Sequence, residues 1–291
     1  MRDKVILKFN GGLGNQMFQW AFARMLEITS DVNVFFEMSY FSKGYARPYQ
    51  LDIFNIEANF VEDIKTKFKL SILWFFREFL RRKRVLGLTF FSERQFNFDP
   101  TIGKIANNTY IEGFFQSEKY FKSIKEELRE DFKFILPMDE ENVSLSQRMV
   151  AGNSVSLHIR RGDYVQKQRY SDTYATCSLD YYRRGVEYIA QRFEEPTLFI
   201  FSDDIPWARG HLKLPYKCIY VSHNTGKKSY EDMRLMSFCK HNIIANSSFS
   251  WWGAWLNKNE NKIVIAPQKW FNDDEIIQTD VIPEEWVRLE N

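Results

Sequence analysis

Short apolar runs and amphipathic stretches alternate at the start of the chain. Residues 5–9 form an apolar run typical of a buried strand, and a glycine-rich turn follows them. Apolar side chains then recur with helical spacing at Phe18, Ala21, Phe22, Met25 and Leu26. Residues 32–36 predict the next strand. The chain therefore opens with a strand, a glycine turn, a helix and a strand, which is the start of a Rossmann-like unit.

A second alternation begins near residue 153. Strands are predicted at residues 154–159, 197–202, 218–221, 242–245 and 262–266, and helices at 179–192, 229–238 and 250–256. Such alternation favours a parallel sheet with helices on both faces. Residues 60–150 give no strand order, and Pro137 with an acidic run predicts a linker at 136–150. We therefore expect an N-terminal domain over residues 1–140, a C-terminal domain over 150–270 and a tail over 271–291.

Composition narrows the possible functions. The chain has 291 residues and a net charge of +2, so nothing drives it towards nucleic acid. Its three cysteines form no C-x-x-C pair, which fits a reducing cytosol. The stretch from Lys65 to Arg84 carries eight basic residues and one acid. It predicts an amphipathic helix that either packs between domains or contacts the cytoplasmic face of the membrane.

Two arginines mark the end of the strand predicted at residues 154–159. Arg160 and Arg161 follow it directly, and His158 lies one pleat earlier. Ligands of open α/β sheets bind outside the carboxyl ends of the strands, and a guanidinium matches phosphate oxygens. The pattern therefore predicts an anion site, with a structural ion-pair network as the alternative. Asp203 ends the next predicted strand and could accept hydrogen bonds from a ribose or a guanine edge.

Two loops complete the predicted site. The turn at residues 11–16 contains Gly12, Gly14, Asn15 and Gln16, and would allow close backbone approach to a diphosphate or a sugar. We expect Asn15 to cap the helix that follows. The turn does not match G-x-G-x-x-G, which argues against a dinucleotide cofactor. The second loop would hold phosphate oxygens at a helix start through Asn246, Ser247, Ser248 and Phe249. Capping of that helix by Ser248 or Ser250 is the alternative.

The three motifs together carry a resemblance to a known family. Residues 11–19, 158–164 and 246–256 resemble, in this order, the bacterial and animal α-1,2-fucosyltransferases of glycosyltransferase family 11. The resemblance implies a GT-B-type α/β fold with two facing Rossmann-like domains and the active site in the cleft between them. It implies inverting transfer from GDP-β-L-fucose to the 2-hydroxyl of a galactose-terminated glycan, which could be lipid-linked. It assigns Arg160 to the donor diphosphate, and Gly12, Gly14 and Asn15 to the neighbourhood of fucose and phosphate.

No cofactor and no metal ion are expected. The sequence contains no D-x-D triplet, the usual mark of a divalent cation bound to a sugar-nucleotide diphosphate. The proton acceptor for the acceptor hydroxyl stays open among Asp163, Asp172, His158 and the leaving phosphate. The alternatives to α-1,2 transfer are a fucosyltransferase of α-1,6 or O-linked type and a non-catalytic protein that binds nucleotide or carbohydrate.

Overall fold

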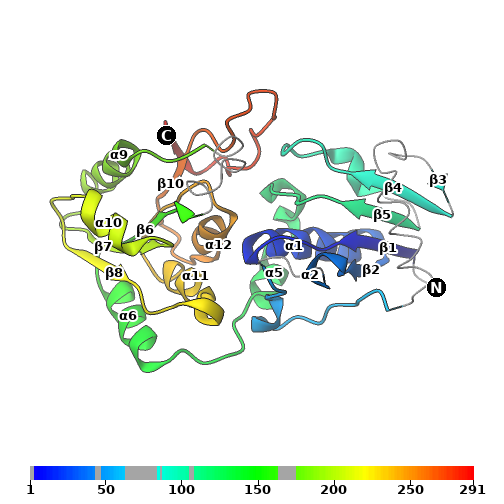
Figure 1. The fold of residues 1–291 in the computed structure, drawn as a ribbon, viewed down its shortest axis with the longest axis horizontal. Coiled ribbons are helices and arrows are strands. Elements are labelled where there is room, and N and C mark those ends of the chain that lie inside the picture. Colours follow the sequence, from blue (N-terminus) through cyan, green and yellow to red (C-terminus); the bar gives the residue numbers. More distant parts are fainter. Residues whose placement is uncertain (1–2, 43–46, 63–83, 86, 105–107, 163–174) are drawn as a thin grey trace. The chain divides into compact units, whose positions relative to one another are not determined.

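The protein is described here by a computed structural model, which covers residues 3–42, 47–62, 84–85, 87–104, 108–162 and 175–291. The chain divides into two compact units (Figure 1). Unit 1 contains Met1–Leu136 and Thr279–Val281, and unit 2 contains Pro137–Gln278 and Ile282–Asn291. Each unit has its own sheet, and the two are described separately below.

Unit 1 is built on a five-stranded sheet with the order β2-β1-β5-β4-β3. Its strands are β1 (Asp3–Lys8), β2 (Val32–Glu37), β3 (Arg84–Val85), β4 (Leu88–Ser92) and β5 (Thr109–Glu112). Its helices are α1 (Leu13–Ser30), α2 (Ser39–Ser42) and α5 (Lys125–Asp131). Among the strands that the structure describes here, β2, β1, β5 and β4 are parallel, and β3 runs antiparallel to its neighbour β4. The carboxyl ends of β1, β5 and β4 therefore lie side by side at one edge.

Helix α1 joins β1 to β2 and buries the apolar stripe seen in the sequence. Met17, Ala21 and Phe22 are fully buried. The helix begins at Leu13 with Gly12 at its N-cap position. The expectation that Asn15 caps it is therefore wrong, because the glycine turn is shorter and the helix starts inside the motif.

Unit 2 is built on a six-stranded parallel sheet with the order β11-β10-β9-β6-β7-β8. Its strands are β6 (Ser154–Ile159), β7 (Thr197–Ser202), β8 (Cys218–Val221), β9 (His241–Ile243), β10 (Val264–Pro267) and β11 (Val287–Leu289). Its helices are α6 (Glu140–Ala151), α9 (Leu179–Ala190), α10 (Ile205–His211), α11 (Tyr230–Met236) and α12 (Ser248–Leu256). The predicted alternation of strands and helices over residues 153–266 is confirmed.

Both faces of the unit 2 sheet are covered. Alternate residues of β7 point to opposite faces, as strand geometry requires. Leu198 and Ile200 pack in one core with α9 and α10, whereas Phe199 and Phe201 pack in another with α6 and α11. A sheet covered on both faces exposes its ligand-binding positions only where the strands end.

Two parts of unit 2 differ from the sequence-based expectation. Residues 140–150, predicted as part of a linker, lie in helix α6, whose N-terminus is capped by the Asp139 carboxylate. The acidic run stabilises the first turn of a helix, where carboxylates oppose the positive end of the helix dipole. Strand β11, within the predicted tail, pairs in parallel with β10.

The basic stretch from Lys65 to Arg84 lies outside the described residues except for Arg84, so its contact with membrane or domain stays a prediction. In the ranges that the structure covers, no helix is long and apolar enough to cross a bilayer.

Candidate active site at the strand ends of unit 2

The register of β6 and β7 brings Arg160 and Asp203 together. Ile159 pairs with Ser202 across the two strands, so the next residue of each strand emerges at the same edge of the sheet. Nη1 of Arg160 lies 2.7 Å from Oδ2 of Asp203, and the Arg161 amide donates to Oδ1 at 2.9 Å. Asp203, predicted to bind ribose or guanine, thus holds the predicted phosphate-binding arginine in place. Its carboxylate is engaged with Arg160, and its contact with a ribose or a guanine edge stays a prediction.

Arg161 has different partners, although it is the next residue. Its guanidinium lies over the Trp207 ring at 3.6 Å from the ring centroid. Nε is also 3.8 Å from Oδ2 of Asp204, the residue that caps α10 through its other carboxylate oxygen. The two arginines therefore have different roles. Arg161 anchors the strand end to α10, whereas Arg160 is held by the Asp203 carboxylate.

His158 lies on the β6 face opposite Val155, Leu157 and Ile159, and is almost fully buried at 6% exposure. Its ring centroid is 5.9 Å from that of Phe249. Burial, opposed by the charge of Asp203 and reinforced by that of Arg160, lowers the pKa of His158 to about 4. The imidazole is therefore neutral at pH 7 and a weak base. Nδ1 is buried without a hydrogen-bond partner in the described part of the chain.

The loop after β9 reaches the same edge of the sheet as Arg160. Strand β9 lies next to β6, with Ile243 opposite Leu157, so both chains leave the sheet side by side. Asn246 is buried at 1% exposure, and its Nδ2 donates to the carbonyl oxygens of Ala175 and Trp270. Its side chain thus fastens neighbouring loops, and the predicted contact of Asn246 with the donor stays a prediction.

Helix α12 begins at Ser248 and offers amide donors at its start. Ser247 occupies the N-cap position, but its hydroxyl makes no capping hydrogen bond. The alternative, in which Ser248 or Ser250 caps the helix, is therefore wrong. The first N–H groups of a helix have no partner inside it and carry the positive end of its dipole. Ser248 and Phe249 are the half-buried residues at this start. The arrangement suits an oxyanion.

The three tryptophans of α12 are buried in the core. Trp251 and Trp252 have no exposed surface, and Trp255 is 3% exposed. Trp252 contacts both other rings at centroid distances of 5.0 and 5.1 Å. These rings hold α12 in place and do not form a sugar-binding platform.

A buried tyrosine that the sequence did not single out supports the arginine. Tyr182 of α9 is 1% exposed, and its hydroxyl accepts a hydrogen bond from the Arg160 backbone amide. Burial raises the pKa of Tyr182 well above its usual value, so the hydroxyl stays protonated. The helical spacing of residues 179–192 marks Tyr182 as a core residue, and only the folded structure reveals its contact with residue 160.

The glycine turn of unit 1 is braced by its own polar side chains. Gly11 has φ +83°, and a Cβ there would lie 2.8 Å from Nδ2 of Asn15. Gln16 is fully buried and donates to the carbonyl oxygens of Gly11 and Pro48, each at 2.9 Å, while Oε1 accepts from the Gln50 amide. Gln16 therefore closes the turn, and its side chain is occupied by the fold.

Asn15 is likewise engaged. Its Oδ1 accepts from Nε2 of Gln116 at 2.8 Å. Around Gly12, a Cβ would find nothing nearer than Cδ of Arg47 at 3.8 Å. Gly14 is buried within α1. Of the four predicted residues, Gly12 alone combines partial exposure with open space beside its Cα, and the donor contacts of the turn stay a prediction.

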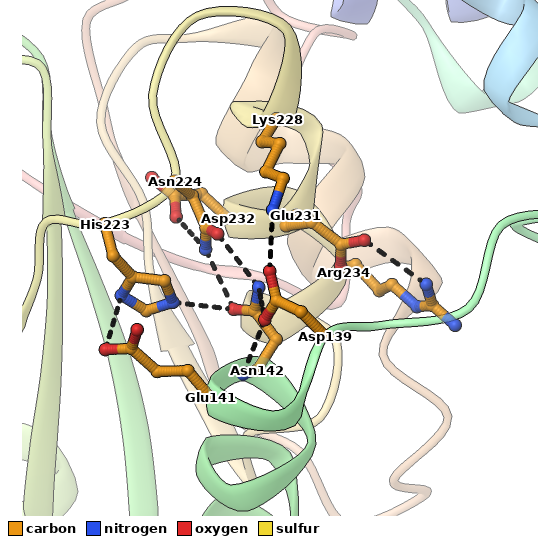
Figure 2. A network of polar contacts seen from close by, with 9 residues as sticks. All are labelled: Asp139, Glu141, Asn142, His223, Asn224, Lys228, Glu231, Asp232 and Arg234. Carbon is orange, nitrogen blue, oxygen red and sulfur yellow. Dashed lines mark hydrogen bonds and ion pairs between the residues drawn. The ribbon is translucent and has the colours of Figure 1, made fainter.

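A polar network joins the loop after β8 to the start of α6 (Figure 2). Asn142 and Asn224 exchange hydrogen bonds of 2.9 and 3.0 Å, and His223 Nε2 lies 2.9 Å from the Asn142 oxygen. Asn224 also donates to Asp232, whose pKa is raised to about 7 by burial and then by Glu231. This network secures the first helix of unit 2 against the loop before α11.

Asp163 and Asp172, the carboxylates considered as proton acceptors, lie outside the described residues. Within the ranges that are described, no three or more His, Cys, Asp or Glu side chains gather in a way that could hold a metal ion.

Comparison with known proteins decides the family. The sequence matches Glycosyl transferase family 11 over residues 4–290. The chain belongs to glycosyl transferase family 11. It is 36% identical to an Alpha-1,2-colitosyltransferase of Escherichia coli, over 98% of this chain and 99% of that protein. It is 27% identical to Galactoside alpha-(1,2)-fucosyltransferase 1 of Saimiri boliviensis boliviensis, over 50% of this chain and 42% of the relative.

The fold agrees with this membership. The NodZ alpha-1,6-fucosyltransferase structure soaked with GDP-fucose has a TM-score of 0.52 and 12% identity, and the match covers 88% of this chain and 93% of that one. The predicted α/β fold with two Rossmann-like units is thereby confirmed, and this family 11 chain is a glycosyltransferase.

Proposed function

We propose that the protein transfers L-fucose from GDP-β-L-fucose to the 2-hydroxyl of a terminal galactoside, with inversion to an α-linkage. The observation that carries this proposal is Arg160, fixed at 2.7 Å from Asp203 beside the start of α12 at the carboxyl edge of a parallel sheet. Family membership supports the reaction class, and the names of the α-1,2 relatives support the linkage and the galactoside acceptor.

The chemistry follows from where charge develops. The acceptor oxygen forms a bond to C1 of fucose while the bond from C1 to the phosphate oxygen breaks, so negative charge grows on the β-phosphate. The hydroxyl proton of the acceptor passes to Asp163, to Asp172 or to the leaving phosphate itself. A preorganised guanidinium and the α12 amides stabilise this charge more strongly in the transition state than in the bound donor. Because Asp203 and Tyr182 already fix Arg160, little reorganisation is needed when the bond breaks.

Buried His158 would contribute as a neutral group. An imidazole with a pKa of about 4 does not add a second positive charge next to Arg160 at neutral pH. Its role in our proposal is a hydrogen bond near the departing phosphate and not removal of the acceptor proton. The transfer would proceed without a metal ion, so Arg160 and the helix amides would stabilise the negative charge on the β-phosphate by themselves.

The test is a transfer assay with purified protein, GDP-fucose and a panel of terminal β-galactosides. We expect GDP release that depends on the acceptor, full activity in EDTA, and a product whose NMR spectrum shows an α-1,2 linkage. Absence of transfer to every galactoside, or a product fucosylated at another position, would refute the proposed reaction. Donor binding without any GDP release would identify a non-catalytic nucleotide-binding protein.

The same assay should be run with GDP-colitose as a second donor, because the relative with 36% identity is a colitosyltransferase. Colitose is fucose without its 3-hydroxyl group. A site that hydrogen-bonds a substrate hydroxyl rejects the analogue lacking it by about 10⁴–10⁵, whereas an apolar site discriminates only weakly. The ratio of kcat/KM for GDP-fucose and GDP-colitose therefore decides which sugar this chain transfers.

A further inference from the structure

The glycine that follows the two arginines lies directly against the Asp203 carboxylate. A Cβ on Gly162 would lie 2.5 Å from Oδ2 of Asp203 and 3.1 Å from its Cγ. Non-bonded carbon atoms attract one another best at about 3.5–4.0 Å, so contacts this short are repulsive. Every residue except glycine carries a Cβ, and any other residue at position 162 would therefore displace this carboxylate.

The oxygen that a Cβ would strike is the one that holds Arg160. Oδ2 of Asp203 pairs with Nη1 of Arg160 at 2.7 Å, and Oδ1 accepts from the Arg161 amide at 2.9 Å. Three consecutive residues thus surround one carboxylate, the first with its guanidinium, the second with its amide and the third, Gly162, with a bare Cα. The direction of the Arg160 guanidinium therefore depends on the space that residue 162 leaves.

The backbone of Asp203 is held on both sides, so only its side chain is able to give way. Ser202 ends β7, and its Oγ accepts from the Asp204 amide at 3.0 Å. Asp204 in turn caps α10 by accepting from the Trp207 amide at 3.1 Å. A Cβ on Gly162 would lie 3.8 Å from Cβ of Asp203, which is an ordinary contact. The carboxylate would therefore rotate away while the strand end keeps its place.

Such a rotation would affect the reaction far more than the fold. The side chains of Arg160 and Asp203 are 20% and 25% exposed, and partly exposed ion pairs contribute little to stability. The φ of Gly162 lies outside the left-handed region, so the backbone there accepts alanine. The guanidinium, however, would lose its fixed direction, and a misplacement of about 1 Å in an active site can lower the rate about 10²-fold.

We infer that Gly162 is a positioning residue for the transfer reaction, because its missing side chain leaves the space in which Asp203 holds the guanidinium of Arg160. The inference rests on the proposed function only in assigning Arg160 to the donor diphosphate.

The first test compares Gly162→Ala with Gly210→Ala in the full chain. Gly210 lies on α10, and a Cβ there would meet no atom within 4 Å in the described part of the protein outside its own helix. We expect Gly162→Ala to lower kcat by a factor of about 10–10² while its urea unfolding midpoint stays near that of the wild type. Gly210→Ala should match the wild type in both measurements.

Asp203→Ala separates a collision with the carboxylate from a need for glycine in the backbone. Once the carboxylate is absent, a methyl group at position 162 has nothing to displace. The double variant should therefore have the kcat of Asp203→Ala to within about twofold. The inference is overturned if Gly162→Ala lowers kcat by the same factor in both backgrounds, if it turns over as the wild type does, or if it loses activity only in proportion to a lower unfolding midpoint.

Nitrogen-15 NMR of the arginine guanidinium groups gives a readout that needs no turnover. Arg160→Ala identifies the Arg160 signals in the wild-type spectrum. We expect these signals to move in Gly162→Ala and in Asp203→Ala, and to keep their positions in Gly210→Ala. This result in a protein that does not transfer fucose would leave the positioning role standing and remove the proposed reaction. Unchanged Arg160 signals in Gly162→Ala would overturn the inference even in an active transferase.

Discussion

Replacing the two adjacent arginines one at a time separates catalysis from structure. The Arg160–Asp203 pair is 20% and 25% exposed, and ion pairs of moderate exposure contribute about 0–1 kcal/mol to stability. Loss of one preorganised donor to a developing oxyanion costs about 3–4 kcal/mol, or roughly 10²–10³ in rate. Arg160→Ala should therefore lower kcat/KM by at least that factor and change the free energy of unfolding by no more than about 1 kcal/mol.

Arg161→Ala should show the opposite pattern. Its guanidinium stacks on Trp207, and a cation–π contact of this kind contributes about 0.5–2 kcal/mol. We expect a lower unfolding midpoint and kcat/KM within a few-fold of wild type. Arg160→Lys should fall between wild type and alanine, because an ammonium keeps the charge but loses the planar fork.

The assay combines initial rates of GDP release at saturating acceptor with urea unfolding of each variant. Near-wild-type turnover of Arg160→Ala would refute the role of this side chain. Equal losses of activity in Arg160→Ala and Arg161→Ala would show that the strand end as a whole matters, and not the guanidinium fixed by Asp203.

Three further variants test the structure. Asp232→Asn should raise the unfolding free energy at pH 8 by up to about 4 kcal/mol and leave it unchanged near pH 4. The pKa of Asp232 is about 7 in the folded protein against an ordinary 3.8, so ionisation of Asp232 destabilises the folded protein as the pH rises between these values. Asparagine does not titrate, so the variant avoids this loss. A pH-independent difference in urea unfolding would contradict this. Gln16→Ala should lower stability by about 1–3 kcal/mol, because three backbone groups lose their partner, and a variant with normal stability but weak donor binding would favour the ligand role. Trp252→Ala should cost about 3–5 kcal/mol in the same unfolding assay, and a smaller loss would place this ring outside the core.

Much of the secondary structure of unit 2 can be predicted from local sequence patterns. The apolar run 154–159 is bounded by polar residues, so β6 and the position of Arg160 could be predicted to the residue. Asp203 could be placed at a strand end, yet its pairing with Arg160 depends on the register of β6 and β7, and the two residues are 43 positions apart in the chain. When two adjacent parallel strands pair over their full length, as β6 and β7 do, the residues that directly follow them are expected to lie close together.

Long-range contacts explain what the sequence concealed. Strands β4 and β5 have only five and four residues. The place of β5 beside β1 is set by pairing across about 100 positions of chain, and β4 then pairs with β5. Gln16 is predicted to contact the donor because it belongs to the glycine motif. Its contacts with Pro48 and Gln50, which lie more than 30 residues away, cannot be read from the sequence. The acidic run predicts a linker, but Asp139 followed by two glutamates is also the pattern of a capped helix, and the structure shows the helix.

The most direct test of the central claim is a crystal structure of the protein with GDP bound. We predict β-phosphate oxygens within about 2.7–3.2 Å of the Arg160 guanidinium and of the first amides of α12. A diphosphate bound elsewhere, with Arg160 contacting Asp203 alone, would contradict the account.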